Sequence, residues 1–176
     1  MEDFVPFQKI PRLFRDIVIT EKLDGTNAQV LVGEDGSVQA GSRNRLITPE
    51  ADNFGFAGWV YANADRLASL LGPGRHFGEW WGLGVQRGYG MTCRRFSLFN
   101  TSRWAGLAEH DLACVPVLYE GPYADSAVHE ALARLASGGS LAAPGFAKPE
   151  GVVVYHKAAN SLFKVTLGDD GHKEAR

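Results

Sequence analysis

The stretch Ile17-Val18-Ile19-Thr20-Glu21-Lys22-Leu23-Asp24-Gly25-Thr26-Asn27 joins an apolar, β-branched run to a charged turn. β-Branched residues favour extended structure, so residues 17–20 predict a strand that ends next to Lys22. A lysine in an isolated Lys-x-Asp-Gly sequence is most often a surface residue at a strand end. It can also be a nucleophile, because partial burial and neighbouring cations lower the pKa of an amine toward neutrality. Gly25 would then let phosphates approach the backbone.

Length and composition are typical of a single soluble globular domain. The chain has 176 residues, of which 45% are hydrophobic, and its formal net charge is −2. A protein that coats nucleic acid non-specifically is usually basic, so nucleic-acid contacts would have to be local. No apolar run approaches the roughly 20 residues that cross a bilayer, and Cys93 and Cys114 form neither a zinc pattern nor a disulfide framework. We expect no membrane association, a cytoplasmic location, one domain over residues 1–167 and a polar tail over residues 168–176.

Hydrophobic periodicity predicts an α+β fold with mostly antiparallel strands. Strands over residues 27–32 and 38–42 are joined by a tight turn at an Asp-Gly pair. Apolar positions over residues 50–71 predict one amphipathic helix, which the Gly-Pro-Gly sequence at 72–74 ends. A second helix is expected over residues 126–135. Further strands are expected at 76–81, 96–99, 114–119, 152–155 and 162–167.

The segment around Lys22 resembles motif I of the covalent nucleotidyltransferases, the superfamily of polynucleotide ligases and mRNA capping enzymes. In that superfamily the lysine attacks the α-phosphate of a nucleotide, and pyrophosphate leaves. The longer match over residues 21–27, Glu-Lys-x-x-Gly-Thr-Asn, resembles the ATP-dependent RNA ligase branch, and Glu21 is counted among the nucleotide-binding residues. Five further segments resemble later motifs in the same order up to Lys164. The resemblance therefore indicates a minimal RNA ligase domain.

The resemblance assigns roles on the nucleotide and strand-end side of the site. Arg43 corresponds to an arginine near the ribose and the reacting RNA end. Glu79, in an aromatic-Gly-Glu strand, corresponds to the motif III carboxylate that accepts a hydrogen bond from a ribose hydroxyl. Arg87 lies in a Gln-basic-Gly element typical of RNA ligases and is predicted to bind the RNA end. Phe96 is predicted to stack on the purine, and Phe99 is expected to be a core residue.

The phosphate side of the predicted site departs from the family pattern. Glu150 resembles the motif IV carboxylate that supports Mg²⁺ (or Mn²⁺) through water, and Asn27 is expected to join the same water shell. Lys164 is predicted to be catalytic and to contact the α-phosphate. The family carries Lys-x-Lys here, whereas Leu162 or Thr166 replaces the second lysine, depending on the alignment. Loss of that charge is expected to weaken transition-state stabilisation.

The implied fold has two mostly antiparallel β-sheets with flanking helices forming a nucleotide-binding cleft, as in the nucleotidyltransferase/ATP-grasp-like ligase core. The implied reaction has three steps. Lys22 attacks ATP to give lysyl-AMP, AMP passes to the 5′-phosphate of RNA, and a 3′-hydroxyl then attacks to seal the strand. The implied partner is RNA with 5′-phosphate and 3′-hydroxyl ends.

About ten residues follow motif V, where similar enzymes carry a further domain, so a partner protein that grips the strand is a further expectation.

Two alternatives stay open. A DNA ligase or a capping guanylyltransferase core is one alternative. A catalytically weak module that binds a nucleotide or an RNA end is the other, favoured by the single lysine in motif V.

Overall fold

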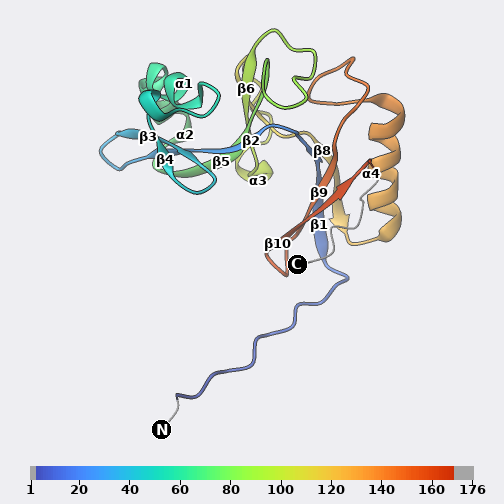
Figure 1. The fold of residues 1–176 in the computed structure, drawn as a ribbon. Coiled ribbons are helices and arrows are strands. Elements are labelled where there is room, and N and C mark those ends of the chain that lie inside the picture. The colour runs from blue at the N-terminus through green and yellow to red at the C-terminus, as the bar shows by residue number, and fades with distance from the viewer. Residues whose placement is uncertain (1–2, 169–176) are drawn as a thin grey trace.

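The computed structural model describes residues 3–168, which form two β-sheets with few helices (Figure 1). One sheet has the strand order β10-β9-β1-β8, and the other has the order β4-β3-β2-β5-β6-β7. The four-stranded sheet consists of β1 (Asp16–Lys22), β8 (Val117–Pro122), β9 (Gly151–His156) and β10 (Ser161–Thr166). The six-stranded sheet consists of β2 (Thr26–Val32), β3 (Val38–Ser42), β4 (Leu46–Ile47), β5 (Gly74–Gly82), β6 (Arg94–Leu98) and β7 (Leu112–Cys114). All strand pairs are antiparallel except β6 with β7, which confirms the predicted α+β class.

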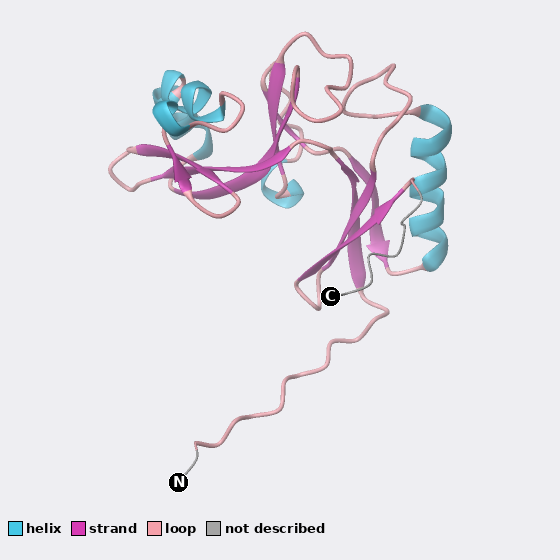
Figure 2. Cartoon of the chain, in the orientation of Figure 1, coloured by secondary structure: helices cyan, strands magenta, loops and turns pink. Residues whose placement is uncertain are grey.

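Helices cover one face of each sheet (Figure 2). The helical elements are η1 (Pro49–Ala51), α1 (Phe56–Ala62), α2 (Ala64–Leu71), α3 (Thr101–Trp104) and α4 (Asp125–Gly138). Helices α1 and α2 pack on the six-stranded sheet around the fully buried Phe56, Val30 and Leu67. Helix α4 packs on the four-stranded sheet through Leu135, against Ile19 and its neighbours. Side chains alternate along a strand, so each sheet keeps a second face free of these helices for the site.

The single helix expected over residues 50–71 is wrong, because three helical segments replace it. Asn63, with φ −119° and ψ 20°, separates α1 from α2. Its side-chain amide donates to the carbonyl of Trp59 at 2.8 Å. Asparagine side chains compete for backbone groups in this way, which makes the residue unfavourable inside a helix. Gly72 ends α2 as predicted, and its N–H donates to the carbonyl of Ala68.

The strand expected over residues 114–119 is also wrong, since two strands in different sheets occupy this region. β7 ends at Cys114 in the six-stranded sheet, and β8 begins at Val117 in the four-stranded sheet. Pro116, between them, has no N–H to donate to a sheet. Its carbonyl accepts from the N–H of Glu21 at 2.9 Å. The crossing between the sheets therefore lies beside the end of β1.

The other expected strands and the 126–135 helix are confirmed to within a few residues. A third apolar cluster, around Leu23, Trp81 and Tyr89, joins the two sheets. None of the helices within residues 3–168 is long and apolar enough to cross a membrane. Apart from Gly168, the predicted polar tail lies outside the described residues.

Candidate active site

Lys22 and Glu150 form an ion pair although 128 residues separate them in the chain. Lys22 ends β1, and Glu150 immediately precedes β9; the two strands pair so that Lys22 lies opposite Gly151. The Nζ of Lys22 donates to Oε2 of Glu150 at 2.6 Å, and the side chains are 23% and 16% exposed. The antiparallel register thus brings the predicted nucleophile to the predicted motif IV carboxylate.

Glu79 anchors a chain of polar contacts beside this pair. Its Oε1 accepts from the backbone N–H of Gly25 at 3.1 Å, and its Oε2 accepts from Nδ2 of Asn27 at 2.9 Å. The Oδ1 of Asn27 in turn accepts from Nε of Arg43 at 3.2 Å. A Cβ at Gly25 would collide with the carbonyl of Trp80, so glycine lets the turn after β1 pack directly on β5. The structure therefore brings three of the predicted site residues into one hydrogen-bonded row.

The pKa of Glu79 reflects its place in this row. Burial raises the pKa from 4.5 to about 6, against the opposing effect of the hydrogen bonds from Asn27 and Gly25. The charge of Lys22 lowers the pKa of Glu79, and the charge of Glu150 raises it. The charges of both members of the ion pair therefore act on the carboxyl group of Glu79.

Lys164 lies on the same face of the four-stranded sheet as Lys22. It pairs with Val153, which pairs with Thr20 on β1, so alternation along the strands directs both lysines to the face opposite α4. Lys164 is exposed. Thr166 lies opposite Gly151, in the same cross-strand row as Lys22. Of the two residues that replace the expected second lysine, Thr166 is therefore in line with the predicted nucleophile.

Glu21 points away from Lys22, toward the segment that follows α4. Its side chain is 1% exposed, and its Oε2 accepts from the backbone N–H groups of Leu141 and Ala142 at 2.8 and 3.0 Å. Its Oε1 is buried and has no hydrogen-bond partner within residues 3–168. A buried carboxylate oxygen without a donor is costly, so Glu21 retains capacity to accept a hydrogen bond.

The two phenylalanines of the 96–99 segment have exchanged their expected environments. Phe96 is fully buried and packs against Phe56 and Trp59 beneath α1, so it offers no ring face to a purine. Phe99 is 42% exposed, and its N–H continues the sheet by donating to the carbonyl of Phe77 at 2.9 Å. The predicted stacking role of Phe96 and core role of Phe99 are therefore contradicted. Apolar alternation shows that the two rings differ in orientation but not which of them faces the core.

Arg87 does not stand free for an RNA end. Its Nε donates to Oδ2 of Asp24 at 2.7 Å, and its Nη1 donates to the carbonyls of Lys148 and Pro149 at 3.0 and 3.4 Å. Asp24 and Tyr89 are two residues that sequence reasoning missed: the Tyr89 hydroxyl accepts from the N–H of Asp24 at 2.8 Å. Asp24 is the acidic residue of the Lys-x-Asp-Gly sequence itself, whereas no pattern singled out Tyr89.

Within residues 3–168, no group of three or more histidine, cysteine, aspartate or glutamate side chains is placed to hold a metal ion. Glu79 and Glu150 nevertheless supply two carboxylates, and Asn27 an amide oxygen. These are hard oxygen donors of the kind that bind Mg²⁺ together with retained waters and phosphates. The residues present therefore fit a divalent cation held largely through water, and not one held in a cage of protein ligands.

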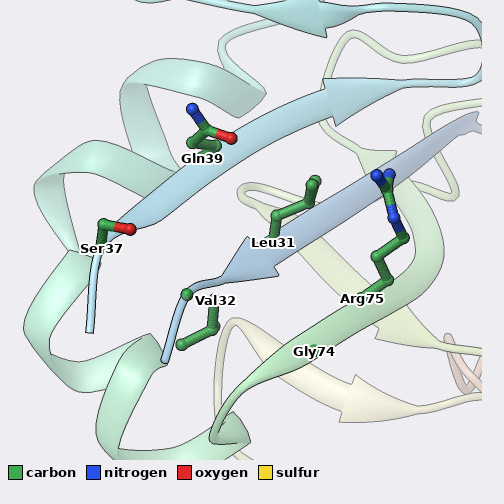
Figure 3. A pocket seen from close by; sticks show the side chains of 7 residues that line it. Leu31, Val32, Ser37, Gln39, Gly74 and Arg75 are labelled. Carbon is green, nitrogen blue, oxygen red and sulfur yellow. The ribbon is translucent and has the colours of Figure 1, made fainter. Parts of the chain in front are cut away.

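A hollow of about 290 Å³ lies farther along the six-stranded sheet (Figure 3). Leu31, Gln39 and Arg75 line it, and in Figure 3 their side chains rise from the same face of the sheet. Leu31 pairs with Arg75 four residues along the strands from the Asn27–Glu79 pair. The hollow contains none of the residues that surround Lys22, so it is separate from the candidate active site.

Comparisons with known proteins place the chain in a family and support its fold. The family model described as RNA ligase matches residues 15–166. A Naegleria gruberi RNA ligase mutant with ATP and Mn is similar, with a TM-score of 0.61 and 20% identity over 88% of this chain and 50% of that chain. Another mutant of that ligase, with AMP and Mn, has a TM-score of 0.61 and 21% identity over the same shares.

An apo mutant of the Naegleria ligase has a TM-score of 0.60 and 20% identity, again over 88% of this chain and 50% of that chain. This chain thus spans about half the length of the solved structures that it matches, and at such identities the likeness concerns the fold. No match was found among curated proteins. Because the family model covers most of the sequence, the chain belongs to the RNA ligase family.

Proposed function

We propose that this domain is an ATP-dependent nucleotidyltransferase of the RNA ligase type, in which Lys22 becomes covalently joined to AMP. The observation that carries the proposal is the Lys22–Glu150 pair at 2.6 Å beside the hydrogen-bonded Glu79–Asn27–Arg43 row. A lysine amine attacks phosphorus only after it loses its proton. Glu150 is the acceptor within hydrogen-bond reach of that amine.

In the first step, the Nζ of Lys22 forms a bond to the α-phosphorus of ATP, and the bond from that phosphorus to the bridging oxygen of pyrophosphate breaks. In the second step, an oxygen of an RNA 5′-phosphate displaces Lys22 from the adenylyl phosphorus. In the third step, an RNA 3′-hydroxyl oxygen attacks the 5′-phosphorus and AMP leaves. The protein contributes mainly positioning and neutralisation of charge.

Residues on both sheets have roles around the α-phosphate. Glu79 accepts a hydrogen bond from a ribose hydroxyl, and Arg43 lies near the ribose and the RNA strand end. Lys164 contacts the α-phosphate from the Lys22 face of the four-stranded sheet. Glu150 and Asn27 would hold a divalent cation, Mg²⁺ or Mn²⁺, through water. That cation supplies charge neutralisation of the ATP phosphates, which makes pyrophosphate a better leaving group.

Two features support adenine as the base. The buried Oε1 of Glu21, which has no partner within residues 3–168, can accept a hydrogen bond, and adenine presents an amino group where guanine presents a carbonyl oxygen. Phe99, half-exposed at the end of β6, offers a ring face for stacking, whereas Phe96 does not. Two of the Naegleria structures that share this fold contain ATP or AMP with Mn, which is consistent with an adenine nucleotide.

The proposal is tested by incubating the protein with α-labelled ATP or GTP and a divalent cation, denaturing it, and measuring label on the protein. We expect acid-labile label from ATP, its loss in Lys22→Ala, and its retention in Lys157→Ala. Lys157 is a matched control because it also forms an ion pair, to Glu120 at 2.7 Å. Absence of any adduct, or an adduct that survives Lys22→Ala, would refute the proposal.

The same experiment separates the alternatives. Label from GTP in preference to ATP would indicate a capping guanylyltransferase. Nucleotide or RNA binding without label would indicate a catalytically weak binding module, which the single lysine of motif V favours. Sealing of nicked duplexes with RNA or DNA on either side of the nick then identifies the substrate. A sealing reaction that needs an added strand-binding protein would support the expected partner.

A further inference from the structure

The loop between β5 and β6 reaches from the six-stranded sheet to both segments that carry the Lys22–Glu150 pair. Arg87 in this loop donates from Nε to Oδ2 of Asp24, two residues after Lys22, at 2.7 Å. From Nη1 it donates to the carbonyls of Lys148 and Pro149, directly before Glu150, at 3.0 and 3.4 Å. One guanidinium therefore contacts the backbone or side chain next to each member of the ion pair.

Tyr89 from the same loop makes a second hydrogen bond with Asp24. Its hydroxyl accepts from the N–H of Asp24 at 2.8 Å, and its ring is 3% exposed. The ring packs edge-on to Trp81, with centroids 4.9 Å apart, and against Phe146 at 4.6 Å. Burial raises the pKa of Tyr89, so the phenol is neutral at physiological pH and remains both donor and acceptor.

The loop is held in a backbone conformation that its sequence does not prefer. Gln86 and Tyr89, on either side of Arg87, have φ values of 45° and 52°. Non-glycine residues adopt such left-handed values rarely, and they keep them where surrounding contacts fix the backbone, often at functional sites. Arg87 is thus presented by a loop whose conformation is determined by packing.

The Arg87 contacts are better suited to positioning than to stability. The side chains of Arg87 and Asp24 are 41% and 28% exposed, and ion pairs that are this accessible contribute little to folding. A guanidinium, however, is planar and donates in several fixed directions, so it can set two groups at a defined separation. Here the two groups are the turn after Lys22 and the segment before Glu150.

We propose that Arg87 is a positioning residue for adenylylation of Lys22, which fixes Asp24 relative to the 148–149 carbonyls and so holds Lys22 and Glu150 in reacting geometry. This inference rests on the proposed function and replaces the expectation that Arg87 binds the RNA end. The two roles differ in the step that they affect. A positioning role acts on the reaction with ATP alone, whereas an RNA-end role acts only when RNA is present.

The test is the single-turnover rate of Lys22 adenylylation by the full chain in the absence of RNA. We expect Arg87→Ala to lower this rate about 10- to 100-fold, with the KM for ATP changed far less, because small displacements of reacting groups cost factors of that size. Arg87→Lys keeps a positive charge beside Asp24 but loses the planar guanidinium that donates in two directions, so its adenylylation rate should be intermediate. Arg75→Ala, which removes an exposed arginine bonded to Gln29, is the matched control and should react normally.

Two further measurements exclude a general structural effect. Added guanidinium should restore part of the rate of Arg87→Ala, and the double variant Arg87→Ala, Asp24→Asn should be no slower than the slower single variant, since both act through one contact.

Full adenylylation by Arg87→Ala, with weak RNA sealing, would overturn this inference and restore the RNA-end role. A wild-type protein that never accepts AMP would instead refute the proposed function. If Arg87→Ala unfolds, Asp24→Asn at unchanged Tm provides the same comparison: a normal rate overturns the inference, and a reduced rate supports it.

Discussion

Replacing Glu79 with glutamine removes the titrating group of the Glu79–Asn27–Arg43 row. Glutamine keeps the size of the side chain but offers one carbonyl oxygen where the carboxylate accepts from both Gly25 and Asn27. Asn27 cannot simply reverse its amide, because its Oδ1 already accepts from Arg43. The substitution therefore changes both the hydrogen bonding and the pH dependence of stability, and the second effect has a predictable size.

Burial raises the pKa of Glu79 from 4.5 to about 6 in the folded protein. Between these pH values the folded state holds the proton more tightly than the unfolded state, so the free energy of unfolding falls as pH rises. A difference of about 1.5 pKa units corresponds to about 2 kcal/mol at 1.36 kcal/mol per unit. Glutamine does not titrate, so the free energy of unfolding of the variant does not fall in this way. Relative to the wild-type protein, it should therefore rise by up to about 2 kcal/mol between pH 4 and pH 7.

The assay is urea unfolding of both proteins at several pH values, with Glu34→Gln, an exposed glutamate in the β2–β3 turn, as control. We expect the difference between Glu79→Gln and wild type to change across pH 4.5 to 6, and the difference between Glu34→Gln and wild type to show no such step. Curves for Glu79→Gln and wild type that stay parallel over this range would refute the idea that Glu79 is held in a desolvated site. The same variant should also bind ATP more weakly, because it loses the carboxylate proposed to accept from the ribose.

Four other changes address the two phenylalanines of the 96–99 segment and the phosphate side of the site. Phe99→Ala should raise the KM for ATP about 5- to 150-fold, whereas Phe99→Tyr should not, since base stacking contributes about 1–3 kcal/mol. Phe96→Ala should instead lower the free energy of unfolding by about 3–5 kcal/mol, measured in urea, because the ring fills the core; an effect on the ATP KM alone would contradict this. Lys164→Ala should slow single-turnover adenylylation about 100-fold at saturating ATP, and an unchanged rate would exclude the phosphate contact. Thr166→Lys should accelerate adenylylation about tenfold, because residue 166 lies in the same cross-strand row as Lys22. Leu162→Lys, which lies in a different cross-strand row, should not accelerate it.

The parts of the fold that depend on local pattern could be predicted from the sequence. The β-branched run at 17–20, the Asp-Gly turn before β3 and the Gly-Pro-Gly sequence at 72–74 all act over a few residues, and each element was found where its pattern indicated. The predicted 50–71 helix also failed for local reasons. Phe54 and Gly55 adopt positive φ values just before α1, and Asn63, between α1 and α2, donates from its side chain to the backbone carbonyl of Trp59. The 114–119 strand failed because nothing in an apolar run reveals that its two halves belong to different sheets.

The partners of site residues depended on contacts that no local pattern contains. Lys22 and Glu150 were predicted to share a site only through the resemblance to other enzymes, and the register of β1 with β9 supplies the physical reason. The contact from Arg87 to Asp24 spans 63 residues, and composition favours a free basic side chain at such a position. Phe96 and Phe99 show the same limit, since the face that meets a helix is decided by packing of distant elements.

Peptide mapping of the protein after reaction with ATP and a divalent cation shows directly whether Lys22 carries AMP. We expect one acid-labile adenylyl group on the peptide that contains Lys22, absent in Lys22→Ala and present in Lys157→Ala. Hydrolysis in acid should return AMP and unmodified lysine. An adduct on any other residue, or an unmodified Lys22 under conditions in which ATP is bound, would contradict it.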